Sequence, residues 1–149
     1  MHMETARIAD QLRRSVEGEA WHGPCLQEAL AGVTAEQAMA KPVAGAHSIW
    51  ELLLHITAWA GAARKRLGGD PSPLSGEGDW PVLSGEWSDA IAAMESEFQA
   101  LRQAVSALPD EDLTKTVPGQ EYDNYFLLHG IVQHTLYHCG QILLLRRAM

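Results

Sequence analysis

The chain lacks the features that mark several large classes of protein. It contains no apolar run of about 18 residues, the length needed to span a bilayer. Its two cysteines are too few for a disulfide scaffold. Its 11 Lys and Arg against 19 Asp and Glu give a net charge of −8, the wrong sign for nucleic-acid binding. Residues 1–10 carry charges and lack a signal-peptide core, so we expect a soluble, cytoplasmic protein that binds neither membrane nor nucleic acid.

The sequence also lacks the marks of β-structure and of several catalytic classes. No segment alternates apolar and polar residues over the length of a strand, and Val, Ile and Thr are sparse relative to Ala and Leu. There is no G-x-S-x-G nucleophile motif, no Gly-rich phosphate loop with its lysine, and no pair of E-x-x-H motifs of the kind found in di-iron bundles. We therefore expect an all-α protein that uses none of these chemistries.

The length favours a single domain over residues 1–149. The chain has no internal repeat, and its hydrophobic fraction of 46% and charged fraction of 20% are ordinary for a globular core. The length leaves no room for two domains with a cleft between them.

Apolar spacing and helix-breaking residues predict four long helices and two short ones. The long helices are expected over residues 4–16, 48–67, 87–108 and 124–147, and the short ones over 25–30 and from Thr34 to no further than Pro42. Residues 68–85 are rich in Gly and Pro and long enough for a crossover, and we expect this loop either to line a site or to be inert. These elements predict a four-helix bundle with a long crossover connection between the second and third main helices.

Polar side chains interrupt the apolar stripe of the last helix. The stripe reads Leu127, Ile131, His134, His138, Gln141 and Leu145. His134 and His138 are four residues apart, so they project from one face and have the spacing of the H-E-x-x-H zinc motif. The glutamate of that motif is absent, and with it the general base of that protease class.

A third histidine occupies an equivalent position on the second long helix. His55 lies in its most apolar stretch, on the stripe that includes Leu52 and Trp59. Three neutral imidazoles on one cation leave coordination positions open for water or substrate. We therefore interpret His55, His134 and His138 as metal ligands. The alternative is a buried polar cluster without metal.

Three residues are candidates for a second catalytic group. Glu51 lies one turn before His55 and could be a fourth ligand or a base, although a capping box with Ser48 already explains it. Gln141 lies one turn after His138 and could hold a ligand, water or substrate, and Tyr137 is adjacent to His138. Cys139 is interpreted as a small packing residue.

The residues around the histidines resemble the DinB-like (YfiT-like) superfamily. The similarity is carried by two segments, SIWELLLHITAW at 48–59 and HTLYHCGQI at 134–142. A third segment, AWHGPCLQEAL at 20–30, is similar to one branch of the superfamily. The resemblance as a whole covers roughly residues 5–147. It implies a four-helix bundle with a crossed connection and one divalent metal, Zn, Ni, Fe or Mn, held by His55, His134 and His138. It also implies that homodimers are common.

The resemblance implies several activities without choosing among them. Relatives are associated with transfer of low-molecular-weight thiols to electrophiles, thiol-dependent isomerisation and metal-dependent hydrolysis. Our main hypothesis is a metal-dependent transferase or hydrolase acting on a small molecule. The alternative hypothesis is a non-catalytic metal- or small-molecule-binding module of a stress response.

Overall fold

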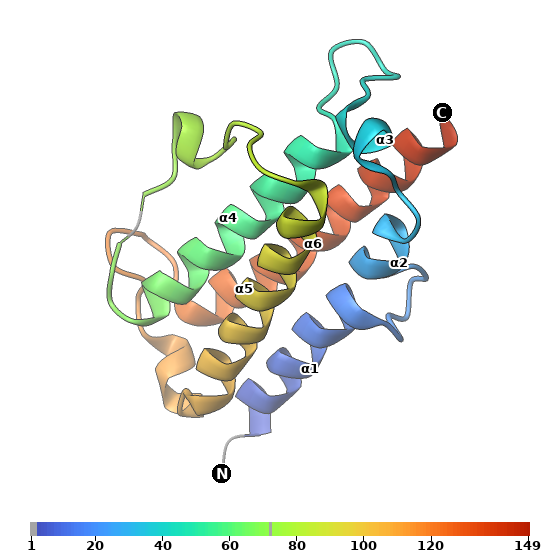
Figure 1. Ribbon diagram of the computed structural model, residues 1–149. Coiled ribbons are helices and arrows are strands. Elements are labelled where there is room, and N and C mark those ends of the chain that lie inside the picture. The colour runs from blue at the N-terminus through green and yellow to red at the C-terminus, as the bar shows by residue number, and fades with distance from the viewer. Residues whose placement is uncertain (1–2, 72) are drawn as a thin grey trace.

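The computed structural model describes residues 3–71 and 73–149, and its regular structure in these residues is helical (Figure 1). The helices are α1 (Met3–Glu17), α2 (Leu26–Leu30), α3 (Ala35–Met39), α4 (Ile49–Leu67), α5 (Trp87–Ala107) and α6 (Asn124–Arg147), with 3₁₀ turns η1 (Gly76–Gly78) and η2 (Asp110–Thr114). An isolated bridge between Thr116 and Asp123 is the sole β-type pairing in this part of the chain. The predicted all-α class is confirmed, and the four long helices end within one residue of the predicted positions.

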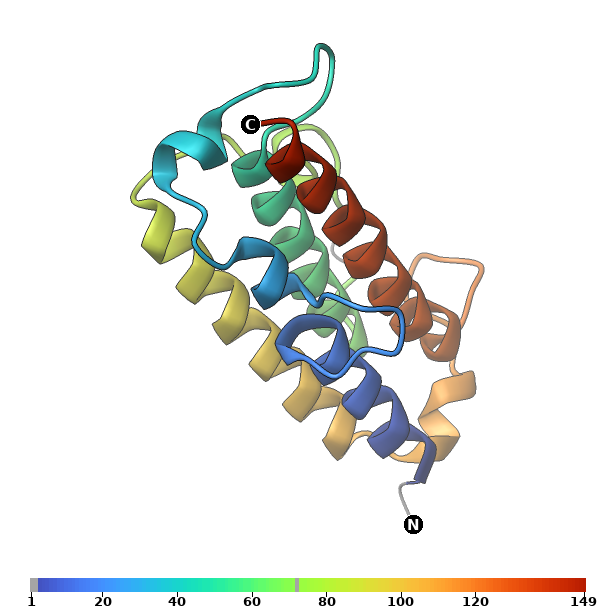
Figure 2. The same cartoon turned by 90° about the vertical axis from the view of Figure 1, so that its right-hand side faces the viewer.

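The four long helices lie side by side, as Figures 1 and 2 show. Helix α4 packs against α5 and α6, and α1 packs against the same two helices. Helices α4 and α5 run in the same direction, so the segment between them returns along the length of α4 before α5 begins (Figure 1). Ser72, within the predicted 68–85 loop, lies outside the described residues. None of the helices described is both long and apolar enough to cross a membrane.

One apolar stripe on each long helix builds the core. On α5 the buried stripe comprises Trp87, Met94, Phe98, Leu101 and Val105, with Ile91 and Leu108 partly buried at its edges. The predicted stripe on α1 is also buried, at Ile8, Leu12 and Val16. Burial of one such side chain contributes about 1.5–3 kcal/mol, so these stripes hold the helices in register.

Side-chain caps fix the ends of the helices that carry the site. The Ser48 hydroxyl accepts from the amide of Glu51 at 3.2 Å, and the Glu51 carboxylate accepts from the amide of Ser48 at 2.7 Å, which confirms the predicted capping box of α4. Asp123 caps α6 by accepting from the amide of Phe126 at 2.9 Å. The start of both helices is therefore set locally.

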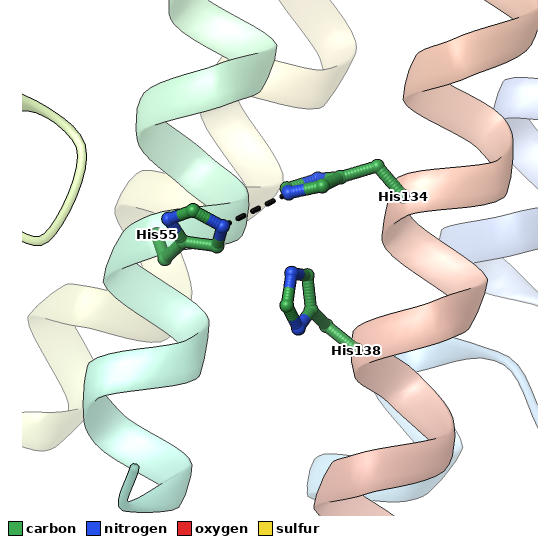
Figure 3. A group of neighbouring side chains, drawn as sticks. All are labelled: His55, His134 and His138. Carbon is green, nitrogen blue, oxygen red and sulfur yellow. Dashed lines mark hydrogen bonds between the residues drawn. The ribbon is translucent and has the colours of Figure 1, made fainter. Parts of the chain in front are cut away.

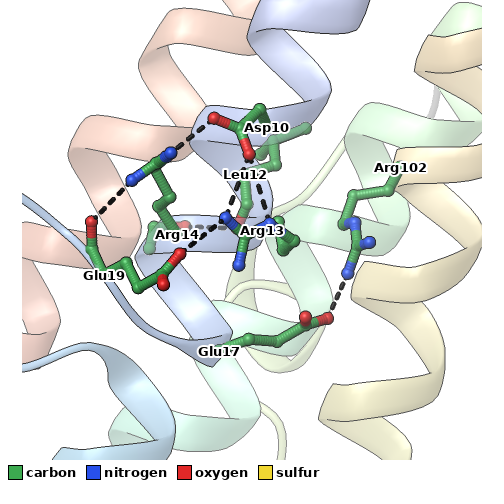
Figure 4. Close-up of polar contacts among 8 residues, drawn as sticks. Asp10, Leu12, Arg13, Arg14, Glu17, Glu19 and Arg102 are labelled. Carbon is green, nitrogen blue, oxygen red and sulfur yellow. Dashed lines mark hydrogen bonds and ion pairs between the residues drawn. The ribbon is translucent and has the colours of Figure 1, made fainter.

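A network of charged side chains holds the turn that follows α1 (Figure 4). Asp10 accepts from both Arg13 and Arg14, and the Arg14 guanidinium is the main cause of the lowered pKa of Asp10. Arg14 also donates to the carbonyl of Glu19 at 3.0 Å, and Glu19 has a φ of 63°, in the left-handed region. Glu17 pairs with Arg102, so this end of α1 is tied to α5.

Candidate metal site

Three histidines converge between α4 and α6 (Figure 3). His55 comes from α4, and His134 and His138 come from α6. One ligand atom from each lies within 4.8 Å of the others, and the Nε2 atoms of His55 and His134 are 3.0 Å apart. Two nitrogen ligands on a tetrahedral ion at about 2.0–2.1 Å would be about 3.3 Å apart. The spacing is close to that of two ligands of one ion.

The position of the cluster follows from the packing of α4 directly on α6. His134 and His138 are one helical turn apart, and their ring centroids are separated by 4.5 Å. The His55 ring lies 4.8 Å from each of them. His55 and His138 are buried and His134 is partly buried, so the group is held at the edge of the core with one side open.

Hydrogen bonds at Nδ1 orient two of the three rings. His55 Nδ1 lies 2.7 Å from the carbonyl oxygen of Asp79, and His138 Nδ1 lies 2.6 Å from Oε1 of Gln141. A carbonyl oxygen can only accept, so each Nδ1 carries the proton and each Nε2 offers a lone pair. A ring held in this way by an outer partner is typical of histidine metal ligands. The donor set therefore fits a divalent ion.

The surroundings of His134 and His138 favour neutral imidazoles. Burial, reinforced by the nearby His138 and His55 rings, lowers the pKa of His134 to about 4. Burial also lowers the pKa of His138, against the hydrogen bond to Gln141 that raises it. Because only a neutral imidazole binds a metal, both rings are in the ligand form at neutral pH.

The connection between α4 and α5 supplies two residues that touch His55. Trp80 stacks between His47 and His55, with ring centroids 3.6 Å and 3.9 Å away. The Asp79 carboxylate accepts from the indole nitrogen of Trp59 at 2.7 Å and lies 3.2 Å from His55 Nδ1. Of the two expectations for the 68–85 loop, the structure supports the one that it lines the site. Asp79 and Trp80 themselves were missed, since a non-periodic segment gives no sign of which residue turns inward.

An open cleft of about 450 Å³ adjoins the histidines. Its remaining wall is mostly aromatic or aliphatic and includes Trp59, Tyr122, Phe126, Leu127, Ile131 and Tyr137. This volume is within the range of small-molecule sites. The three imidazoles form its polar end.

The structure separates the three candidates for a second catalytic group. Glu51 is held by its cap, and its carboxylate lies 3.1 Å from Lys41 and 3.4 Å from His47. Gln141 orients His138 and lines a second cavity of about 330 Å³. Tyr137 lines the cleft itself, with its ring 5.0 Å from that of His138.

The two cysteines are buried, free thiols. Burial raises the pKa of Cys139 to about 11, and burial is also the main cause of the raised pKa of Cys25. A thiol with a raised pKa stays protonated near neutral pH and is a poor nucleophile. The packing role expected for Cys139 is confirmed.

Removal of the Asp79 side chain should weaken metal binding. The Asp79→Ala change keeps the carbonyl that accepts from His55 but removes the carboxylate that anchors Trp59. Loss of an outer-shell partner costs about 10–100-fold in metal affinity, and we expect about 10-fold because the carbonyl remains. Competition with a chromophoric chelator measures this affinity. Glu77→Ala, an exposed carboxylate two residues earlier, is the matched control, and equal affinity of the two variants would contradict the role of Asp79.

Comparison with known proteins agrees with this geometry. Residues 22–142 match the DinB superfamily, and this range contains His55, His134 and His138. Searches of curated proteins and of solved structures gave no significant match. The match extends over most of the chain, which therefore belongs to the DinB superfamily.

Proposed function

We propose that the protein is an enzyme dependent on a single divalent metal, and that it transfers a thiol to a small molecule or hydrolyses one. The observation that carries this proposal is the convergence of three imidazoles at the polar end of an open cleft. Family membership and the parallel course of α4 and α5 support the finer description of the fold as a four-helix bundle with a crossover connection.

Different residues would bind the ion, orient its ligands and exchange a proton in such a site. His55, His134 and His138 hold the ion, while the Asp79 carbonyl and Gln141 fix the orientation of two of these rings. A bound divalent ion supplies Lewis acidity, which makes a thiol or a water molecule acidic enough to be a nucleophile near neutral pH. Tyr137, on the cleft wall beside His138, is placed to exchange a proton with the reacting molecule.

The proposal also covers the metal and the setting of the reaction. Three imidazole ligands suit Zn, Ni or Fe, and Mn is proposed on family membership alone. The free thiols of Cys25 and Cys139 support a reducing compartment such as the cytoplasm. A low-molecular-weight thiol as co-substrate and a homodimer are proposed on family membership alone.

One observation favours a non-catalytic metal-binding module as the second candidate. The carboxylate nearest the histidines on α4, Glu51, is occupied by its cap and its ion pairs, and Asp79 is occupied by Trp59. A site without an available carboxylate base has less capacity for general base catalysis.

Untagged protein purified without chelator should contain about one equivalent of a transition metal by elemental analysis. Metal added to the depleted protein should raise its Tm, because a ligand that binds only the folded state stabilises it. A screen with thiols, electrophiles and ester substrates then separates the two candidates, since turnover supports the enzyme and its absence the binding module. Protein with no metal and no Tm response to Zn, Ni or Mn would overturn both.

A further inference from the structure

The cleft beside the histidines has an uneven distribution of polarity that restricts what it can bind. We propose that it takes a small, uncharged, largely apolar molecule, such as an aromatic ring or alkyl group with one metal-binding head, and disfavours anionic ligands. This inference rests on the proposed function, because the metal is the polar end of the site. The evidence lies in the charge, the occupied polar groups and the shape of the wall.

The wall offers little that could pair with a charged group. Among the described residues that line the cleft there is no lysine or arginine. The carboxylate on the wall, Asp79, carries the same sign as a carboxylate, phosphate or sulfonate ligand would. An anionic group placed against this wall, away from the metal-binding head, would lose its hydration without gaining a counter-ion, which is costly.

Two polar groups of the aromatic wall, those of Tyr122 and Trp59, already have partners within the protein. The Tyr122 hydroxyl accepts from Arg66 at 3.1 Å, and Arg66 also donates to the carbonyl of Pro71. The Trp59 indole nitrogen donates to Asp79. These bonds turn the polar atoms toward the protein, so the rings present mainly their apolar faces to a ligand.

A stripe along α6 gives this wall its shape. Phe126, Gly130 and His134 are spaced one turn apart, and Tyr137 lies close to the same line. Phe126 is 65% exposed and Tyr137 is 66% exposed, so this face of α6 presents an unusually large area of aromatic surface to solvent. A Cβ added at Gly130 would meet nothing within 4 Å, so this glycine leaves a gap between the aromatic rings, one turn before a metal ligand. A ligand whose head binds the metal beside His134 would extend its apolar part across Gly130 toward Phe126.

Two thiols of similar reach test the inference on cobalt-loaded protein. Phenylmethanethiol and 2-mercaptoethanesulfonate have the same metal-binding thiol head. The first carries an apolar phenyl ring, and the second carries an anionic sulfonate. The thiolate-to-cobalt absorption band reports binding of each. We expect the benzyl thiol to bind at least about 10-fold more tightly, as burial of an aromatic ring predicts.

Two glycines of α6 provide the matched variants. Gly130→Leu places a side chain in the gap, and we expect it to remove most of the preference for the benzyl thiol at unchanged metal content. Gly140→Leu introduces the same residue at an exposed glycine that also has nothing within 4 Å and does not line the cleft. This control should keep the preference.

The outcomes separate the inference from the proposed function. Equal or tighter binding of the sulfonate thiol, or a preference that survives Gly130→Leu, would overturn the inference and leave the metal site intact. If the protein takes up no metal, the proposed function fails, and the cleft is probed without metal by NMR of the Trp59 indole N–H. A shift with benzyl alcohol but not with 2-hydroxyethanesulfonate would then support an apolar cleft, and the absence of that difference would refute it.

Discussion

The double variant His134→Ala/His138→Ala should keep its helical fold and lose its metal. The change leaves His55 as the one imidazole of the cluster, and a single imidazole does not hold an ion against water and buffer. We expect metal content to fall from about one equivalent to below about a tenth. A metal present at about 1,000 times its Kd stabilises a folded protein by about 4 kcal/mol, so the Tm response of the wild type to added metal should also disappear. Elemental analysis, circular dichroism and thermal unfolding measure the three quantities.

A control that removes the same number of histidines makes this result specific. His22→Ala/His129→Ala leaves the cluster intact, since His22 is an exposed side chain bonded to the carbonyl of Pro24 and His129 packs on Tyr125 at 4.3 Å. This variant should retain its metal. Metal that stays with the first double variant, or leaves the second, would show that the three converging rings are not the binding site.

The Phe98→Ala variant should have the largest effect on stability. Phe98 is 2% exposed and lies in the middle of the buried stripe of α5, which packs against both α1 and α4. Truncation of a buried phenylalanine leaves a cavity and costs about 3–5 kcal/mol in the free energy of unfolding, a large part of the stability of a domain of this size. Urea denaturation in the absence of metal gives this number directly.

Phe126→Ala is the matched comparison for that measurement. Phe126 is 65% exposed, so its truncation removes little buried surface and should cost less than about 1 kcal/mol. Similar losses for the two variants would mean that α5 does not form the centre of the core. Because Phe98 is on a helix that carries none of the three histidines, folded Phe98→Ala protein should bind metal as the wild type does.

The helices and the histidine cluster could be predicted because both depend on periodicity within one helix. The positions of His134 and His138 on an apolar stripe indicate a shared face whatever lies opposite. His55 is 79 residues away from His134, but it obeys the same rule on its own helix. Local rules likewise predicted the Ser48–Glu51 cap. Because the cap already explains Glu51, they also favoured a structural role for Glu51 over a role as metal ligand or base.

The contacts made by Asp79 and Trp80 could not be predicted in this way. Asp79 reaches His55 across 24 residues, and Trp80 follows it, from a segment whose one regular element is the short turn η1; their direction depends on how that segment packs against α4. The direction of Gln141 was also open from sequence alone. The Gln141 side chain faces His138 and accepts a hydrogen bond from its ring, because side chains three residues apart on a helix lie beside each other.

The assembly of the site from distant segments links metal uptake to folding. In an unfolded chain His134 and His138 are still neighbours, but His55 and the Asp79 carbonyl that orients it are brought to them only by tertiary contacts. If the proposed function holds, the unfolded chain would keep only a two-histidine half-site of low affinity, and the folded chain would offer the complete three-histidine site. The metal would act as a reporter of correct assembly: a variant in which α4, the loop and α6 fail to meet should be metal-poor even when its helix content is normal.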